Sequence, residues 1–462
     1  MPTPTLQATT GPVFYPEDDG YDAERRGYNL SVEHHPAVIF GVADAGDVVT
    51  AVRYAAELGL PVAVQATGHG PCFPADEAVL ISTARMDAIE VDTVSRTARF
   101  EAGVRSGDLV RAAAEHGLAP LNGSAPGVGA VSYHLGGGVG MLGRQFGYAV
   151  DHVRAMDVVT ADGQLRRVTA EQGAELFWAL RGGGKGYLGV VVAMEIDLHP
   201  VTRLRGGGMH FSAETTAQAL HTYATWAATA PEDMGSSVLL IRMPDVPGVP
   251  EQMRGRYVSH VRFAFTGSAE DGERLVRTFR DIGPLTDTVG EMPYRDVGTI
   301  HAEPTTPVAF HARNSMLRTL DAGAVETLLR HAGPAAGAPY LVELRHLGGA
   351  LSRPPVVPSA LGRRDGQFCL YSGAVATGDE DVVFLRRSLA HLHNAMAPWA
   401  TGGACLNFLA GSDVSDAQVR SAFLTSDLAR LQDIKRRIDP TNTFCLSPAI
   451  TAAGPSRRLL PS

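Results

Sequence analysis

Three glycine-rich segments lie within one block of the chain, between residues 66 and 192. They read ATGHG at 66–70, GSAPGVGAVSYHLGGGVGMLG at 123–143 and RGGGKGYLGVVV at 181–192. Glycine weakens helices and strands, so 51 glycines in 462 residues need an explanation. Glycine also lets backbone N–H groups turn toward an anion and lets a ligand approach the chain closely. Ordinary turns would explain one such cluster, but three together predict loops wrapped around a large phosphate-bearing cofactor.

Two of these segments match the dinucleotide-binding pattern G-x-G-x-x-G, at 138–143 and at 184–189. A Rossmann site needs a strand before the pattern and a helix that opens at it. The first match is followed by RQFGYAVDHV, which is a poor helix sequence, and the second by VVVAMEIDLHP, which has the pattern of a strand. The sequence therefore argues against an NAD site of the Rossmann type.

Bulk composition limits the partners that the chain is expected to have. The net charge is -9, and no lysine and arginine block is present, which argues against nucleic-acid or membrane binding. The N-terminal sequence lacks the pattern of a secretory signal, and no apolar run is long enough to span a membrane. Four scattered cysteines without a CxxC pair suggest neither a metal site nor a disulfide framework. A cytoplasmic protein with reduced thiols is expected, as a monomer or a homodimer.

The chain is long enough for two domains, and its texture changes near residue 204. Up to about residue 200 strands, helices and glycine-rich loops alternate. The pattern predicts a helix over 44–59, strands over 59–64 and 77–83, a strand and a helix within 96–117, a hairpin over 153–169 turning at Asp162-Gly163, and a short helix over 174–184.

The second part of the chain combines longer helices with antiparallel strands, which predicts an α+β domain. The apolar spacing predicts helices over 213–230 and 269–283, and strands over 236–243, 257–267, 339–349 and 367–375. Near the C-terminus a further helix is expected to end at Asp439-Pro440.

The segment from Val64 to Pro200 resembles the FAD-linked oxidases of the para-cresol methylhydroxylase (PCMH) type, and in particular the berberine bridge enzyme-like (BBE-like) oxidases. The resemblance is carried by TGHG at 67–70, LGGGVGMLGRQFGYAVDHV at 135–153, VVTADG at 158–163, ELFWALRGGGKGYLGVV at 175–191 and RRIDPTNTF at 436–444. Their order and spacing agree over most of the chain, with the weakest agreement in the middle third.

The resemblance implies a division of the chain into three parts. Residues 1–203 would form an FAD-binding domain of the PCMH type, built from two α+β subdomains with a core at about 36–203. Residues 204–405 would form a substrate-binding domain with an antiparallel sheet flanked by helices. Residues 406–462 would return to the FAD-binding domain.

In the resembled family the loop histidine bonds covalently to the 8α carbon of FAD, and the matching residue is His69. The glycines on either side of His69 permit a path that brings backbone to the pyrophosphate and still aims one imidazole at the flavin edge. The residues expected to bind FAD are Ala66, Thr67, Gly68, His69, Gly70, Gly123, Ser124, Ala125, Val128, Gly129, Tyr133, Gly137, Gly138, Gly140, Gly189, Val190, Val191 and Asn442.

Many relatives carry a second covalent link, from a cysteine in a G-x-C-P-x-V-G stretch to flavin C6. This chain has alanine at that position, Ala125, which implies a single link through His69. Cys72 does not occupy the family position and is interpreted as a small packing residue. Val128 lies three residues after Ala125, where valine accompanies reaction of the reduced flavin with oxygen in the family, so the resemblance implies an oxidase.

Catalysis in this family transfers a hydride from substrate to flavin N5, and a base takes the substrate proton. The predicted strand around residue 343 offers Glu343 and Arg345 on one face by alternation, and the strand over 367–375 offers Tyr371. The Asn-Tyr pair that relatives use near the C-terminus is Asn407-Phe408 here. Glu343 and Tyr371 are therefore the alternative base candidates, and Arg345 is the candidate to hold an anionic or carbonyl group of the substrate.

The sequence thus predicts an FAD-dependent oxidase, with hydride transfer from a small organic substrate and release of hydrogen peroxide after reaction with O₂. An alcohol, a sugar or an intermediate of secondary metabolism would be the substrate. The missing tyrosine keeps a flavin-dependent monooxygenase or cyclase open as an alternative. A flavoprotein that binds without turnover is a third alternative, from a different class.

Overall fold

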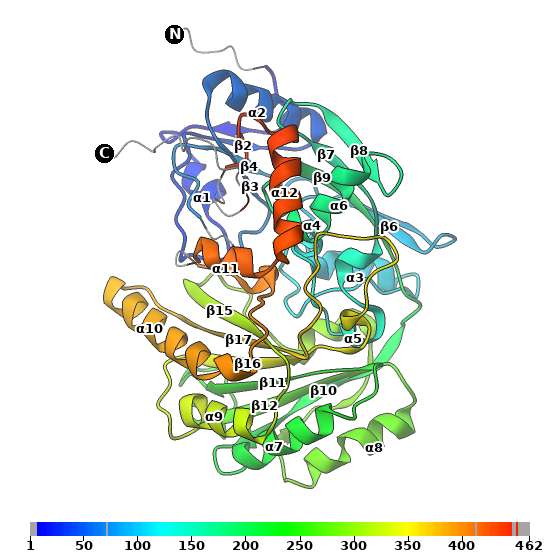
Figure 1. Ribbon diagram of the computed structural model, residues 1–462, viewed down its shortest axis with the longest axis vertical. Helices are drawn as coiled ribbons and strands as arrows, with labels where there is room; N and C mark the ends of the chain where they lie inside the picture. The colour runs from blue at the N-terminus through cyan, green and yellow to red at the C-terminus, as the bar shows by residue number, and fades with distance from the viewer. Residues whose placement is uncertain (1–6, 71–72, 412–413, 446–449, 451–462) are drawn as a thin grey trace.

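The computed structural model describes residues 7–70, 73–411, 414–445 and 450. The strands form three sheets. Figure 1 shows the strands β1 to β9 in the upper half of the molecule and the strands β10 to β17 in the lower half. The predicted α+β fold is confirmed, and the change of sheet falls between the end of β9 at Asp197 and the start of β10 at Arg203.

The first sheet is small and mostly parallel. Its order is β1-β2-β4-β3, with β2, β4 and β3 parallel and β1 antiparallel to β2. The strands are β1 (Val13–Phe14), β2 (Val38–Gly41), β3 (Val62–Gln65) and β4 (Val79–Ser82). The helices α1 (Tyr21–Arg25) and α2 (Ala45–Leu58) belong to the same segment. Asp44 caps α2. Gly59, with φ 68°, ends it, so the predicted helix is confirmed.

The second sheet is antiparallel, in the order β5-β6-β9-β7-β8. The strands are β5 (Ile89–Asp92), β6 (Thr97–Glu101), β7 (Val153–Val159), β8 (Leu165–Thr169) and β9 (Val190–Asp197). The associated helices are α3 (Ser106–Ala114), α4 (Ala130–Leu135), α5 (Gly143–Phe146), the 3-10 helix η1 (Ala149–His152) and α6 (Ala174–Gly183). The β7–β8 hairpin turns at Gly163, whose φ is 67°, so the predicted hairpin is confirmed. The two G-x-G-x-x-G matches lead into the four-residue α5 and into β9, which is not the context of a Rossmann site.

The third sheet has eight strands, in the order β13-β10-β12-β11-β16-β17-β15, with β14 also paired to β10. The strands are β10 (Arg203–Ser212), β11 (Met234–Arg242), β12 (Tyr257–Phe265), β13 (Thr286–Asp287), β14 (Gly290–Pro293), β15 (Phe310–Leu317), β16 (Leu341–His346) and β17 (Phe368–Val375). All of its pairings are antiparallel.

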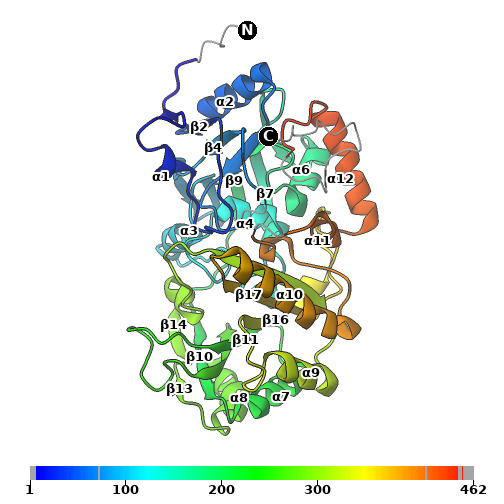
Figure 2. The same ribbon diagram turned by 90° about the vertical axis from the view of Figure 1, so that its left-hand side faces the viewer.

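One face of this sheet carries an apolar core shared with helices. The core joins side chains of the sheet to α7 (Thr216–Ala227), α8 (Ala269–Arg280), α9 (Ala322–Ala332) and α10 (Asp379–Ala395). Figure 2 shows α7, α8 and α9 at the bottom of the molecule, away from the upper half, and α10 alongside β17. Three short 3-10 helices, η2 (Tyr294–Ile300), η3 (Gly349–Ser352) and η4 (Ala397–Trp399), complete this part of the chain.

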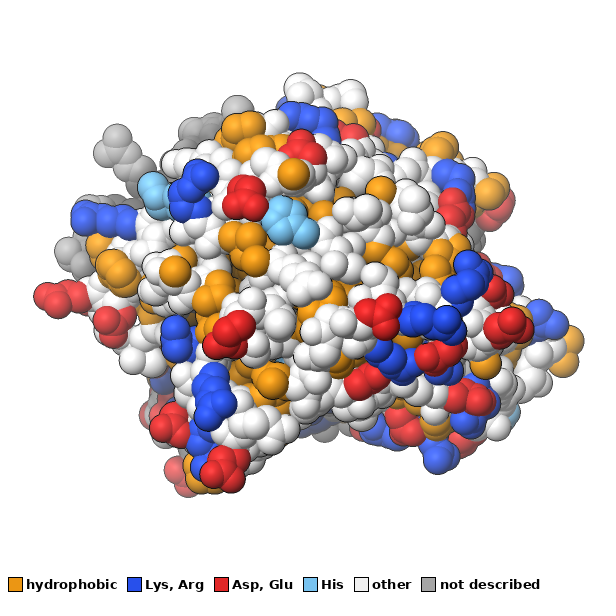
Figure 3. Space-filling model, turned by 90° about the horizontal axis from the view of Figure 1, so that it is seen from below, with side chains coloured by type: hydrophobic (Ala, Val, Ile, Leu, Met, Phe, Trp, Pro, Cys, Tyr) orange, Lys and Arg blue, Asp and Glu red, His pale blue; other side chains and the backbone are white. Residues whose placement is uncertain are grey.

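The outer surface of the helical layer is polar. Seen from below in Figure 3, acidic and basic side chains are interspersed there with small hydrophobic areas. The helix α8 is strongly amphipathic, since it buries Val276 and Phe279 while Glu270, Asp271 and Arg274 lie toward solvent. No helix of the described segments combines the length and the hydropathy that crossing a bilayer requires.

The C-terminal segment returns from the lower half to the upper half. It contains η5 (Leu406–Phe408), α11 (Asp416–Ser421) and α12 (Thr425–Ile438), and α12 packs against α6. Lys435 is buried on α12, where it pairs with Asp439 and donates to the carbonyl oxygens of Tyr187 and Phe444, each at 2.9 Å. Beyond α12, which ends before Asp439 as predicted, Thr443 accepts a hydrogen bond from the N–H of Val62 at 2.8 Å. The last part of the chain is therefore joined to the first sheet.

Candidate functional site

The loop after β3 presents His69 in a fixed orientation. The ring stacks on Tyr28 with centroids 3.9 Å apart and planes at 6°. Nδ1 lies 2.9 Å from the Thr67 hydroxyl, and the same hydroxyl accepts the N–H of Gly129 at 3.2 Å. The Thr67 hydroxyl thereby connects the glycine-rich loop at 66–70 to the loop at 123–129, and both loops lie next to the His69 ring.

The electrostatic surroundings keep His69 neutral. Burial, reinforced by the positive charges of Arg105 and Lys185, lowers the pKa of His69 to about 4. A neutral imidazole keeps a lone pair on one nitrogen, which bond formation to an electrophilic carbon requires. On the Nε2 side the loop comes close, since a Cβ built on Gly127 would lie 3.4 Å from both Cε1 and Nε2 of His69.

The two loops also offer backbone donors for an anion. Within the described segments the N–H groups of Gly68, His69, Gly123, Ser124 and Ala125 have no hydrogen-bond acceptor. Buried or half-buried amides are normally paired, so a row of amides without acceptors indicates a ligand site. The donor set fits the phosphates and polar ring edges of a dinucleotide such as FAD.

The second glycine cluster is held against the C-terminal segment. Gly138 donates to the side-chain oxygen of Asn407 at 3.2 Å, and the amide nitrogen of Asn407 donates to the carbonyl of Tyr133 at 3.0 Å. Gly137 and Gly138 have φ of 107° and 78°, which side chains other than glycine rarely adopt. The Tyr133 ring packs against Gly138, and its hydroxyl, beside Gly140, is buried and has no partner among the described residues. Asn407 therefore links η5 to the predicted cofactor loop.

The remaining cofactor predictions fall in different places. Gly189, with φ of 144°, packs against Val159, and Val190 and Val191 continue from it as buried residues of β9. At Gly186 a Cβ would meet nothing within 4 Å, so the third glycine cluster leaves open space. Asn442 is exposed and precedes Thr443, whose carbonyl accepts a hydrogen bond from Val62 at the start of β3. It lies at the end of β3 opposite to the His69 loop, and the structure does not bring it to that loop. Cys72 lies outside the described residues.

The large sheet turns a polar face toward these loops. By strand alternation and register, Ser237 of β11, Arg262 of β12, Glu343 and Arg345 of β16 and Tyr371 of β17 share this face. Arg345 donates to the hydroxyl of Ser124, in the second glycine cluster, at 2.8 Å. The sheet and the predicted cofactor loop therefore meet directly.

Glu343 is the centre of a buried ion cluster. Its two carboxylate oxygens accept from Arg262 and from Arg345, each at 3.0 Å, and His301 Nε2 lies 3.4 Å away. Burial alone would raise the pKa of Glu343, but Arg345, His301 and Arg262 together hold that pKa well below its usual range. Glu343 is therefore a stable carboxylate that orients two guanidinium groups.

Arg345 and Tyr371 adjoin the C-terminal aromatic residue Phe408. The Arg345 guanidinium lies 4.8 Å from the centroid of the Phe408 ring, and the rings of Tyr371 and Phe408 are 5.3 Å apart. Burial, with the nearby charge of Glu303, raises the pKa of Tyr371. Phe408 thus takes a place in the site even though it lacks a hydroxyl.

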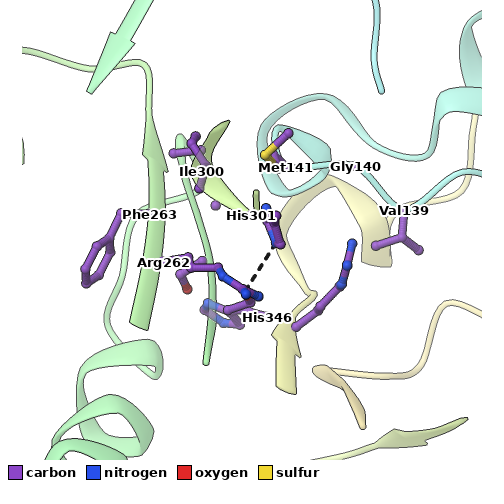
Figure 4. A pocket seen from close by; sticks show the side chains of 13 residues that line it. Val139, Gly140, Met141, Arg262, Phe263, Ile300, His301 and His346 are labelled. Atoms are coloured by element: carbon purple, nitrogen blue, oxygen red, sulfur yellow. Dashed lines mark hydrogen bonds between the residues drawn. The ribbon is translucent and has the colours of Figure 1, made fainter. Parts of the chain in front are cut away.

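A small cavity of about 30 Å³ lies between the polar sheet face and the second glycine cluster. Its walls include Gly140 and Met141 of the cluster, Arg262 and Arg345 of the sheet, and His301. Figure 4 shows His301 and Arg262 directed into the same space, with Met141 and Gly140 on the opposite side. A cavity of this size holds a water or one small polar group.

The 3-10 helix η2 fixes the position of His301 relative to the cofactor loop. Tyr294 donates to the carbonyl of Pro120 at 2.7 Å and contacts the Asn122 side-chain oxygen at 2.6 Å. A Cβ on Gly298 would lie only 2.6 Å from Pro126, so η2 packs tightly on the loop that contains Ala125.

Sequence reasoning found part of this site. The structure places His69, Ser124, Glu343, Arg345 and Tyr371 on the two loops and the sheet face that meets them. Arg262 was missed, although His260 and Arg262 alternate in the apolar strand β12 and so gave the same signal as Glu343 and Arg345. His301 was missed because it follows a short 3-10 helix, where no periodic pattern marks it.

Comparison with known proteins agrees with this geometry. A family model described as an FAD binding domain matches residues 36–169. The (R)-6-hydroxynicotine oxidase of Paenarthrobacter nicotinovorans is 29% identical, with 94% of this chain and 95% of the relative covered. A carbohydrate oxidase of Microdochium nivale is 23% identical, with 96% of this chain and 94% of the relative covered.

Solved structures show the same overall fold. The 6-hydroxy-D-nicotine oxidase of Arthrobacter nicotinovorans superposes with a TM-score of 0.82 at 26% identity, covering 95% of this chain and 97% of that chain. A BBE-like protein of Physcomitrella patens superposes with a TM-score of 0.84 at 20% identity, covering 96% of this chain and 98% of that chain. The likeness therefore extends over nearly the whole chain, including the middle third.

Proposed function

We propose that this chain, an FAD-linked oxidoreductase of the BBE-like type, is an oxidase that carries FAD covalently on His69 and acts on a small organic molecule. When bound, FAD would accept a hydride from the substrate and pass the electrons to O₂, giving hydrogen peroxide. The observation that carries the proposal is the His69 loop. A neutral, stacked imidazole stands there beside a row of backbone amides without acceptors.

The link is proposed at Nε2 of His69. Nδ1 is engaged with the Thr67 hydroxyl at 2.9 Å, whereas Nε2 faces the loop of the second glycine cluster. Stacking on Tyr28 holds the ring plane, so the nucleophilic nitrogen is aimed before the bond forms. A single link is proposed because Ala125 occupies the position at which relatives have a linking cysteine.

The substrate is proposed to bind between the polar sheet face and the flavin loops, with Arg345 holding an anionic or carbonyl group. Ser124 and Glu343 fix the Arg345 guanidinium from two sides. Relatives named for 6-hydroxynicotine and for carbohydrates support an alcohol, an amine or a sugar as the substrate class. Val128, half-buried in the loop with its N–H bonded to Ala125, is proposed to leave room for O₂. A cytoplasmic monomer or homodimer in secondary metabolism is part of this proposal.

The predicted proton acceptors Glu343 and Tyr371 stay predictions. Three donors surround the Glu343 carboxylate, which favours an orienting role for this residue. Tyr371 has a raised pKa, which favours its neutral phenol.

The covalent link is tested by denaturing the yellow protein in acid. We expect the flavin to stay with the polypeptide and a digest to place it on the peptide that contains His69. His69→Ala should release the flavin on denaturation, whereas His35→Ala, at an exposed histidine, should retain it. Flavin that leaves the wild-type chain entirely would contradict the covalent link.

Turnover is tested by mixing the protein anaerobically with (R)-6-hydroxynicotine, cellobiose, chitobiose and xylobiose. Bleaching of the flavin by one of them, followed by one peroxide per product after O₂ is admitted, is the expected result for an oxidase. Product without peroxide would indicate a monooxygenase, and a flavin that no compound of such a panel bleaches would count against an enzyme of these substrate classes.

A further inference from the structure

His301 is a buried histidine with one ring nitrogen in use and one free. Its side chain is part of the cavity wall, and the residue is only 9% exposed. Nε2 lies 3.4 Å from the carboxylate of Glu343 and 3.5 Å from the hydroxyl of Ser237. Nδ1 is buried and has no partner among the residues that the structure describes. A buried polar atom without a partner calls for an explanation, and a catalytic role or a bound water or ion are the ones that a cavity wall offers.

The contacts of Glu343 determine which nitrogen carries the proton. A carboxylate only accepts hydrogen bonds, and its other two partners, Arg262 and Arg345, are donors. Nε2 must therefore be the N–H donor toward Glu343, which leaves the lone pair of the neutral ring on Nδ1. The arrangement has the logic of an acid–histidine pair, in which a buried carboxylate fixes the tautomer and the other nitrogen accepts a proton.

The groups around His301 come from each neighbouring element. They are Ser237 of β11, His260 and Arg262 of β12, Glu343, Arg345 and His346 of β16, and Glu303 in the segment after η2. Burial, together with Arg262, lowers the pKa of His301 to about 4 against the opposing effect of Glu343. The ring is therefore neutral at neutral pH, and the lone pair on Nδ1 can accept a proton. The Glu343 carboxylate can stabilise the imidazolium that forms.

From the cavity wall, His301 would be able to contact a substrate bound on the flavin. Arg345 in its wall contacts Ser124, and η2, which ends just before His301, packs on the loop containing Pro126. The space of about 30 Å³ has room for the hydroxyl or amine end of a substrate.

We propose that His301 is a catalytic residue, the acceptor of the substrate proton at Nδ1, and that Glu343 is its positioning residue. This inference rests on the proposed oxidase function. The substrate's C–H bond breaks and its two electrons leave with the hydride to FAD, while its O–H or N–H bond breaks and the proton goes to Nδ1. A C=O or C=N bond forms, and the proton passes from Nδ1 to solvent. O₂ would take the two electrons and the hydride's hydrogen from the reduced cofactor and one proton from solvent, giving H₂O₂.

The kinetic test compares the wild-type holoenzyme with His301→Gln, which fills similar space but cannot hold the proton. The probe is whichever compound of the panel above bleaches the wild-type flavin, and the rate of anaerobic bleaching is measured from pH 3.5 to pH 9. We expect a loss on the order of 10²–10⁴-fold in His301→Gln. In the wild type the rate should fall as the pH drops through about 4, because Nδ1 becomes protonated, and the variant should lack this dependence.

The matched control is His210→Gln. His210 lies in the same sheet, its pKa is also lowered to about 4 by burial, but it is bonded to Thr286 and does not line the cavity. This variant should keep both the rate and its acid limb. A His301→Gln protein with normal FAD content and a wild-type bleaching rate would overturn the proposal.

A second measurement separates this inference from the oxidase proposal. If no compound bleaches the wild-type flavin, the oxidase proposal fails. The tautomer of His301 can still be measured, and it tests whether Nδ1 can accept a proton. In holoenzyme labelled with ¹⁵N-histidine, the resonance pair lost in His301→Gln should show an unprotonated Nδ1 and a protonated Nε2 at pH 7. A proton on Nδ1 would overturn the assignment whatever the substrate is.

Discussion

The two faces of the large sheet are built from the same strands and differ in almost every respect. On the helix side, Val238, Val342, Leu344 and Leu370 are at most 1% exposed and belong to one apolar core. On the side of the cofactor loops, Glu343 and Arg345, adjacent in sequence to Val342 and Leu344, form one hydrogen-bonded cluster with Arg262. Burial of apolar area stabilises the fold, whereas desolvated charges seldom do. The helix face thus accounts for the stability of the sheet. The buried charges of the polar face are accounted for by the proposed substrate binding and proton transfer.

The largest effect is expected from Glu343→Gln, on the polar face. Among the residues that the structure describes, Glu343 is the one carboxylate that contacts both Arg262 and Arg345, each at 3.0 Å, and the change removes its charge. Buried Arg262 then loses its carboxylate partner and Arg345 keeps only Glu303, at 3.6 Å, among the described residues, so the free energy of unfolding should fall by about 3–5 kcal/mol. Urea unfolding of the FAD-loaded protein measures this. If the polar cluster is a structural element only, Arg262→Gln added to Glu343→Gln should restore stability and activity together, but we expect it to restore stability alone.

Leu344→Ala tests the opposite face one residue along β16. Leu344 is buried among the helix-side residues, so the cavity left by the change should cost about 2–5 kcal/mol of unfolding free energy. Because the side chain points away from the cofactor loops, the rate of flavin bleaching and its pH dependence should not change at temperatures where the variant is folded. An altered pH dependence would show that the two faces are coupled.

Acid should destabilise both faces, through histidines that stay neutral in the folded protein. Burial lowers the pKa of His393, between Ser315 and Ser372 on the helix side, to about 3, and that of His301 to about 4. An unfolded histidine takes up a proton near pH 6.5, so the unfolded state binds more protons below that pH and stability falls as the pH drops from 6.5 toward 4. Melting temperatures across this range test it. His393→Gln should flatten the dependence, and an unchanged slope would mean that His393 contributes nothing to it.

The smallest expected effect on stability belongs to Val128→Leu, in the loop that faces the polar side of the sheet. The added methylene should cost roughly 1–3 kcal/mol if the site is tight. Its main effect is expected on the reaction with O₂, because the side chain would fill the space proposed for oxygen. Stopped-flow reoxidation of the reduced protein should slow strongly while anaerobic bleaching stays nearly constant. Equal slowing of both reactions would mean that Val128 supports the site as a whole.

Much of the difference between the two faces of the large sheet could be predicted from the sequence, because side chains alternate between the faces along each strand. Glu343 and Arg345 stand among apolar neighbours in β16, and that pattern alone predicts two polar side chains on one face. The glycine clusters likewise predicted the loops, since positions such as Gly137 and Gly138 need positive φ.

The rest depends on contacts between segments far apart in sequence. Nothing near residue 301 indicates that η2 packs on the loop at 123–129, or that a carboxylate 42 positions later meets this imidazole. Asn442 stays a prediction as an FAD-binding residue, because β3 places it at the end away from the His69 loop, where the motif alone did not locate it. Strand register and loop packing determine these distances, and local sequence patterns do not predict either of them.

The return of the C-terminal segment has a consequence for how the protein is made. Thr443 completes the edge of β3, and the buried ammonium of Lys435 ties α12 to Tyr187 and Phe444. On the ribosome, the strand that leads into the His69 loop emerges early but stays without this edge until almost the whole chain has been synthesised. The large sheet, which is made in between, is complete sooner. We therefore expect the flavin to be captured after translation ends, and chains released early to carry a folded lower half without the cofactor.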